Sequence, residues 1–169
     1  MDMKIRAAGI SDAPSISKLI IPLSEHYILH EFPPQARQAL LASMSPDGIA
    51  KLMESGCAYH LAEMDHRVVG VVAIKECSHL YHLFVDEAHQ RRGIARQLWT
   101  TAMQVCLDGG ASGEFSVNSS RYAQSVYERL GFIVRSAAQG RNGVVSIPMI
   151  FSPQAGNNLG QVRKRCRHT

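Results

Sequence analysis

Apolar residues recur with two different periods along the chain, and each period predicts a different kind of element. Residues 3–7 alternate apolar and charged side chains, as expected for a first strand. Residues 16–23 place apolar side chains on one stripe of an amphipathic helix, which Pro22 must kink or interrupt. Residues 26–34 are expected to be irregular, and a further short helix begins at Pro46.

The centre of the chain changes to the period of strands. Two β-rich runs, at 58–64 and 68–75, are separated by a short polar turn and predict a hairpin. The segments that follow are expected to be a strand at 80–85, a helix at 93–107, a strand at 114–118, a helix at 121–130 and strands at 132–135 and 144–150. The order β, α, α, β, β, β, α, β, α, β, β predicts one mixed α/β (α+β) sheet flanked by helices.

Composition and charge are those of a globular protein. Of the 169 residues, 46% are apolar and 19% are charged. The formal net charge of +4 comes from a basic, acid-free segment after residue 151, and the rest of the chain is neutral. We therefore expect one domain at 1–151 and a basic, disordered tail at 152–169. Such a tail is more typical of a solubilising end than of a nucleic-acid arm, so nucleic acid is not expected as a partner.

Neither a membrane span nor a metal centre is expected. No apolar run approaches the roughly 20 residues of a membrane helix, and residues 1–6 lack the apolar core of a secretory signal. These features predict a cytoplasmic protein without a membrane partner. The four cysteines, Cys57, Cys77, Cys106 and Cys166, lie far apart without a CxxC pair, which predicts neither a zinc site nor a disulfide framework.

A polar turn between an expected strand and an expected helix has the composition of an anion-binding site. It consists of Gln90, Arg91, Arg92, Gly93, Ile94 and Ala95. Small residues at 93 and 95 let the backbone approach a ligand, the first amides of a helix favour an anion, and the arginines add charge. Similar turns occur in unrelated proteins. This one matches neither GxxxxGK[ST] nor GxGxxG, so nucleotide hydrolysis and dinucleotide binding lose support.

The turn and its flanks resemble one known family. QRRGIA is similar to the Q/R-x-x-G-x-G/A signature of the GNAT acyltransferase superfamily, with Ala95 in place of the commoner second glycine. Residues 79–90 resemble the strand that precedes this signature, and residues 118–132 resemble the later N-x-x-x-x-A-x-x-x-Y-x-x-x-G-F pattern. The resemblance extends from residue 3 to about 150 and implies a mostly antiparallel sheet that splays between its central strands.

The resemblance also implies a donor, acetyl-CoA, and residues that bind it. In this family the strand before the turn offers free backbone groups to the pantetheine arm, and Leu83, Phe84 and Val85 match that stretch. Asn118 matches an asparagine that bonds the same arm, although a strand-end asparagine is otherwise a turn or cap residue. The turn at 90–95 would hold the diphosphate.

The resemblance implies a tyrosine as the general acid and leaves several candidates for the general base. Tyr127 matches the family's tyrosine beside the thioester sulfur and would protonate the departing thiolate. No Cys/His or Ser/His nucleophile pair is evident, which favours direct attack by an amine in a ternary complex. His79 and His82 are candidate bases because histidine titrates in the useful range, and acidic or imidazole groups at 25–31 or a water chain remain alternatives.

The acceptor is left open by the sequence. A small-molecule amine and a protein amino group are both compatible with the resemblance, and a homodimer is neither indicated nor excluded. The alternative function is a non-catalytic acyl-CoA-binding sensor of the same fold.

Overall fold

A single twisted sheet forms the centre of the protein. The computed structural model describes residues 2–153. The strands are β1 (Met3–Ala7), β2 (Cys57–Met64), β3 (Arg67–Lys75), β4 (His79–Val85), β5 (Phe115–Ser119), β6 (Ile133–Val134), β7 (Gln139–Arg141) and β8 (Val144–Phe151). Their order is β1-β2-β3-β4-β5-β8-β6, with β7 paired to β8. All pairs are antiparallel except β4 with β5, so the mixed, mostly antiparallel sheet expected from the sequence is confirmed.

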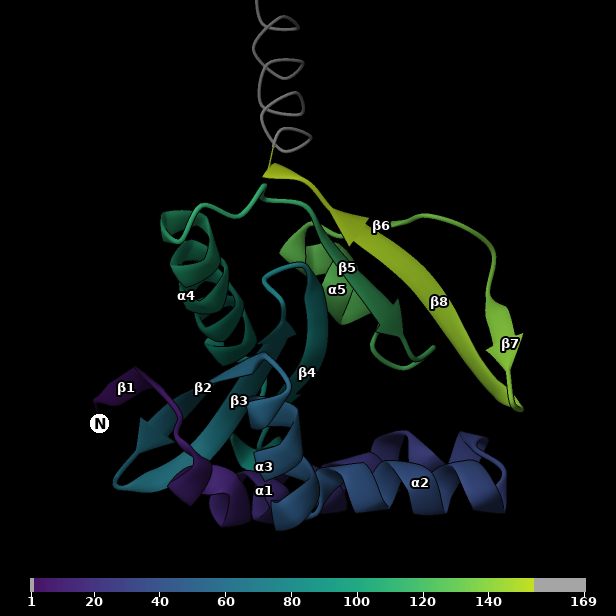
Figure 1. Cartoon of the computed structure of the whole chain (residues 1–169), viewed down its shortest axis with the longest axis horizontal. Coiled ribbons are helices and arrows are strands. Elements are labelled where there is room, and N and C mark those ends of the chain that lie inside the picture. Colours follow the sequence, from purple (N-terminus) through teal and green to yellow (C-terminus); the bar gives the residue numbers. More distant parts are fainter. Residues whose placement is uncertain (1, 154–169) are drawn as a thin grey trace, which may run out of the picture.

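Helices cover both faces of the sheet (Figure 1). They are α1 (Ala13–Tyr27), α2 (Pro34–Met44), α3 (Pro46–Glu54), α4 (Ile94–Asp108) and α5 (Gln124–Leu130), with short 3₁₀ turns η1 (Ile10–Asp12), η2 (Leu29–Glu31) and η3 (Glu87–His89). Within residues 2–153, no helix has the length and apolar character that a membrane crossing requires.

The sheet opens between β4 and β5. These parallel strands share one register pair, His79 with Ser116, and then diverge, as Figure 1 shows. The ladder between β3 and β4 is also irregular, since Ala73 pairs with His82 and Ile74 with Leu80. Tyr81 is therefore the extra residue of a bulge that bends β4 beside the opening.

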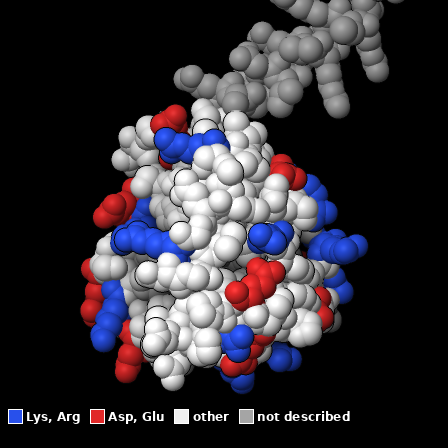
Figure 2. Space-filling model, turned by 90° about the vertical axis from the view of Figure 1, so that its right-hand side faces the viewer, with Lys and Arg blue, Asp and Glu red and all other residues white. Residues whose placement is uncertain are grey.

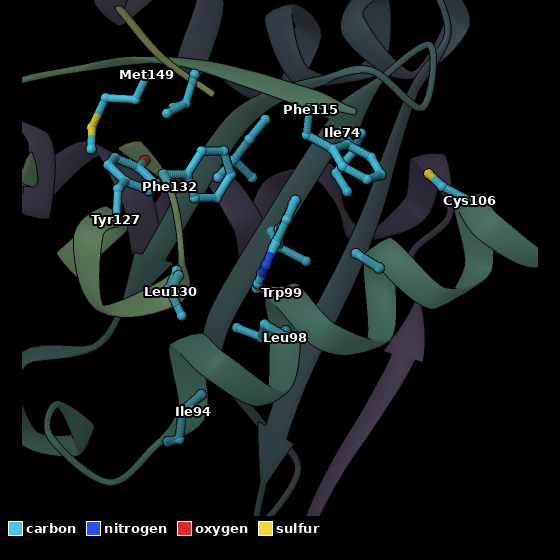
Figure 3. Packing of buried hydrophobic residues seen from close by; sticks show 14 of the residues in the cluster. Ile74, Ile94, Leu98, Trp99, Cys106, Phe115, Tyr127, Leu130, Phe132 and Met149 are labelled. Atoms are coloured by element: carbon cyan, nitrogen blue, oxygen red, sulfur yellow. The ribbon is translucent and has the colours of Figure 1, made fainter. Parts of the chain in front are cut away.

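Two apolar clusters lie on opposite faces of the sheet. Trp99 of α4 is central to one of them, where its ring lies 5.1 Å from the centroids of Phe115 and Phe132 and 5.3 Å from that of Phe151 (Figure 3). The other cluster joins α1 and α3 to β2 and β3. Helices α1 and α5 consequently pack on different faces and flank the opening between β4 and β5.

Three local expectations need correction. Pro22 does not interrupt α1, which continues to Tyr27. Helix α2 was not expected, because its residues are mostly exposed and only Met44 is buried, so no apolar stripe marks it. Strand β7 was also missed, although Asn142 and Gly143, with φ of 53° and 77°, are the Asn-Gly pair typical of a two-residue hairpin turn.

A disulfide joins two of the cysteines, so the expectation that they form none is wrong for this pair. Cys77 follows β3 and Cys106 lies near the end of α4, and their Cα atoms are 5.3 Å apart. The 29-residue separation hides this proximity from the sequence. Cys57 is free and buried. Strand β8 ends at Phe151, and residues 154–169 of the expected tail lie outside the described residues.

Candidate active site

A groove of about 600 Å³ lies where β4 separates from β5. Its walls come from the end of β4, the turn before α4, the face of α5 and the last turns of α1. Leu83, Phe84 and Val85 all line it, together with Gly93, Ile94 and Ala95 of the turn. The structure thus brings the two segments that the sequence singled out into one cavity.

The turn before α4 presents open backbone amides to this groove. Gly93 is the N-cap of α4 and has φ of 78°, a left-handed conformation that favours glycine, and Arg91 has φ of 62°. The first backbone bond of the helix runs from the Gln97 N–H to the Gly93 carbonyl at 3.1 Å. Among residues 2–153 the amides at 91–96 have no acceptor. A helix start with this geometry can bind an anion through its amides and the helix dipole.

Side chains around the turn brace it and supply charge. Gln90 donates from Nε2 to the Val85 carbonyl at 3.0 Å, which fixes the turn to the end of β4 and occupies one backbone group of that strand. Arg91 lines the groove, whereas Arg92 does not. His89 also lines the groove, and its Nδ1 lies 2.6 Å from Asp86 Oδ2.

Two further arginines line the groove and were not found by sequence reasoning. Arg96 donates to the Arg129 carbonyl at 2.7 Å, so α4 and α5 are joined beside the anion-binding turn. The sequence could have pointed to Arg96, because it directly follows the motif and lies in the first turn of a helix expected to bind an anion. No pattern in the sequence points to Arg129, because this residue reaches the groove only through the packing of α5.

Tyr127 lines the groove from α5. Tyr127 is 8% exposed, and its ring makes an edge contact with the ring of Phe132, with the centroids 5.7 Å apart (Figure 3). Burial raises the pKa of the Tyr127 phenol well above its ordinary value of 10. The phenol is therefore neutral at physiological pH and able to donate a hydrogen bond or a proton into the groove. No partner for its hydroxyl lies within the described residues.

His79 and His82 lie outside the groove lining. The bulge at Tyr81 places them on one face of β4, opposite Lys75 and Ala73 in register. His79 Nδ1 lies 2.7 Å from Ser116 Oγ where β4 and β5 meet, and burial, followed by the charge of Lys75, lowers its pKa. His82 is 4% exposed, and burial lowers its pKa to about 4.

The remaining residues singled out from the sequence are also placed away from the groove lining. Asn118 is exposed on β5, in register with Pro148 of β8. Glu25, His26 and Glu31 are exposed near the end of α1 and in η2, and none lines the groove. Leu23, Tyr27 and Ile28 of the same region do line it. No cluster of three or more His, Cys, Asp or Glu side chains suited to a metal ion occurs between residues 2 and 153.

Charge on the surface is mixed. Figure 2 shows basic and acidic side chains interspersed over a largely uncharged surface on the face that it presents. The described residues on this face form no continuous basic stripe.

Comparison with known proteins identifies the family of this chain and structures that share its fold. The family model described as Acetyltransferase (GNAT) domain matches residues 28–152. N-acetyltransferase 8 of Homo sapiens is 32% identical over 105 residues, which are 55% of this chain and 46% of that protein. N-acetyltransferase 8B of Homo sapiens is 33% identical over 106 residues, with 56% and 46% covered. The chain spans about half the length of these curated relatives.

Solved structures agree with the fold. The PaiA N-acetyltransferase of Thermoplasma acidophilum, in complex with coenzyme A, superposes with a TM-score of 0.76 at 15% identity, covering 90% of this chain and 99% of that one. A GCN5-related N-acetyltransferase from Rhodopseudomonas palustris gives 0.72 at 18% identity, with 90% and 98% covered. At these identities the likeness concerns the fold alone. Because the family model covers most of the described residues, the chain belongs to the GNAT acetyltransferase family.

Proposed function

We propose that this protein transfers an acetyl group from acetyl-CoA to a primary amine by direct attack in a ternary complex. The observation that supports this most strongly is the open helix start at Gly93, which faces the same groove as Tyr127. One end of the groove suits a diphosphate, and the other has a neutral proton donor. This is the arrangement that a CoA thioester requires.

The chain offers binding groups along the whole length of the groove. The amides at 93–95 would hold the diphosphate, with Arg91 lining the groove and Arg92 contributing charge from outside it. Beyond His79, the β4 edge has no strand partner toward β5, so the backbone groups of residues 83–85 that point away from β3 are open to an extended ligand, apart from the Val85 carbonyl that Gln90 occupies. Asn118 would act on the same arm only after its side chain turns toward the groove.

Direct attack needs a proton acceptor and a proton donor. A neutral amine attacks the thioester carbon, the C–S bond breaks, and the nitrogen loses a proton while the sulfur gains one. Tyr127 would donate to the sulfur, since its raised pKa keeps the phenol protonated. The tyrosinate that remains is a strong base, with a reference pKa of about 10 that burial raises further, so it takes up a proton from solvent or buffer before the next cycle.

Of the two histidines, His79 is the better candidate for the base. Its lowered pKa keeps the imidazole neutral near pH 7, and its bond to Ser116 orients the ring at the vertex of β4 and β5. His82 is almost fully enclosed and bonded to Tyr59. Proton transfer from the groove to His79 would pass through a water, because His79 does not line the groove.

Acetyl-CoA incubated with a panel of small amines and peptides, followed by assay of the free thiol, tests the activity. Tyr127→Phe should lower kcat by on the order of a hundredfold and leave coenzyme A affinity nearly unchanged, because a general acid acts in the transition state. Retention of full kcat by this variant would remove Tyr127 from the mechanism. Binding of coenzyme A without thiol release on any acceptor would favour the sensor function.

A charge substitution tests the donor-binding end separately. Ala95→Asp places a carboxylate in the groove beside the diphosphate and should weaken coenzyme A binding on the order of tenfold or more. Ala88→Asp adds the same charge on exposed η3, outside the groove lining, and is the matched control. Equal effects of the two variants in calorimetry would argue against a diphosphate at Ala95.

A further inference from the structure

Two tyrosines from opposite sides of the sheet stack at the groove. Tyr27 is the last residue of α1, and Tyr122 lies in the turn before α5. Their ring centroids are 4.6 Å apart with an interplanar angle of 20°, and both residues line the groove. Tyr27 is partly buried, and Tyr122 is 50% exposed.

This stacked pair crosses the opening in the sheet. Helix α1 packs with the cluster on one face and α5 with the cluster on the other, so a contact between their ends must pass the gap left by β4 and β5 (Figure 1). Past the His79 and Ser116 bridge, strand pairing does not close that gap. The two tyrosines therefore join the α1 wall of the groove to its α5 wall.

A third segment fixes Tyr27 in this position. Its hydroxyl donates to Glu87 Oε1 at 2.9 Å, and Glu87 lies in η3, directly after β4. The bond to this carboxylate raises the pKa of Tyr27 to about 12, so the phenol remains a donor at any physiological pH. An exposed stack and an exposed hydrogen bond are weak in comparison with the buried clusters, so this contact can open while the fold remains intact.

We propose that Tyr27, Tyr122 and Glu87 form an aromatic latch that controls the passage of the donor into and out of the groove. The inference rests on the proposed function, since it assigns the groove to a coenzyme A thioester. The stacked rings, the α4 turn and Tyr127 all line this one groove, so an arm that extends from the turn toward Tyr127 would lie against the rings. The latch parts to admit the arm and closes again over it, so that opening limits both association and release.

Binding kinetics distinguish a latch from an ordinary wall of the site. The probe is etheno-coenzyme A, which is fluorescent on its adenine and has an unmodified pantetheine arm. Stopped-flow mixing gives the association rate, and a chase with unlabelled coenzyme A gives the dissociation rate. For Tyr122→Ala and Tyr27→Ala we expect both rates to rise roughly tenfold while the Kd changes less than about threefold, because removal of a gate affects both directions.

Further variants make the test specific. Tyr27→Phe keeps the stacked ring but loses the bond to Glu87, so both rates should rise by a smaller factor, and Glu87→Gln should do the same. The double variant of both tyrosines to alanine should match either single variant, because the latch acts as one unit. Ile10→Ala, at an exposed apolar residue of η1 outside the groove lining, is the control and should leave both rates unchanged.

The outcomes separate this inference from the proposed function. A rise in the dissociation rate alone would show that the tyrosines are only contacts of the bound donor and would overturn the latch. Unchanged rates in every variant would overturn it as well, while native binding of the probe would leave the proposed function standing. Failure of the native protein to bind etheno-coenzyme A would overturn both.

Discussion

Lowering the pH from 7.5 to 5 is expected to destabilise the fold in part through His82. Burial lowers the pKa of this imidazole from 6.5 to about 4 in the folded protein. As the pH falls through 6.5, the unfolded chain takes up a proton that the folded chain does not bind, so the stability present above pH 6.5 is lost toward pH 4. One such group costs about 2 kcal/mol by pH 5 and about 3 kcal/mol by pH 4.

Urea unfolding at a series of pH values measures this loss. Native protein and His82→Gln would be compared, because glutamine is uncharged at every pH and can keep a hydrogen bond to Tyr59. His60 and His79 also have lowered pKa values, and their contributions are common to both proteins. Above pH 5 the carboxylates held by Arg6 stay ionised, since their pKa values are lowered from values already below 5.

The difference between the two proteins is the informative quantity. The free energy of unfolding of His82→Gln should fall with pH about 2 kcal/mol less than that of the native protein between pH 7.5 and 5. Parallel curves would refute the reasoning, because they would show that His82 becomes charged in the folded state as readily as in the unfolded chain.

Two further predictions concern the fold. Reduction of the Cys77 to Cys106 disulfide should lower the free energy of unfolding by about 3–4 kcal/mol, because it releases a constrained loop of the unfolded chain, and Cys57→Ser should keep this sensitivity to reductant. A reductant-insensitive urea midpoint would count against the bond. Leu98→Ala should cost about 2–5 kcal/mol, because Leu98 is fully buried, whereas Val105→Ala, at an exposed position of the same helix, should cost less than about 1 kcal/mol. Similar losses in both variants would contradict the packing described for α4.

Much of the fold could be predicted because each apolar face repeats with a local period. The hairpin of β2 and β3 and the helix α4 correspond closely to the segments expected from periodicity alone. Helix α2 could not be found in this way, since its burial is limited to Met44. Strand β7 could have been found, because the Asn-Gly pair at its turn is a local signal.

The candidate site likewise has a part that local sequence predicts and a part that it does not. The turn at 90–95 is a short, contiguous motif, so its position at the start of a helix followed from neighbouring residues. Contacts between distant residues have no such signal. The stack of Tyr27 on Tyr122 and the bond between Tyr59 and His82 depend on how the sheet brings separate elements together. The bulge at Tyr81, which moves His79 and His82 to one face, is likewise visible only in the pairing with β3.

The single pair between β4 and β5 also has a mechanical consequence. The sheet consists of two parts, β1 to β4 and β5 with β8, that are joined by the single residue pair of His79 and Ser116. The Ser116 amide is held there by the Ser78 carbonyl at 2.9 Å. A ligand that widens the groove can rotate one part of the sheet against the other without breaking the backbone hydrogen bonds within either part. Hydrogen exchange within β2 and β3 should therefore be unchanged by such a movement, whereas the Ser116 amide, at the junction, should exchange faster.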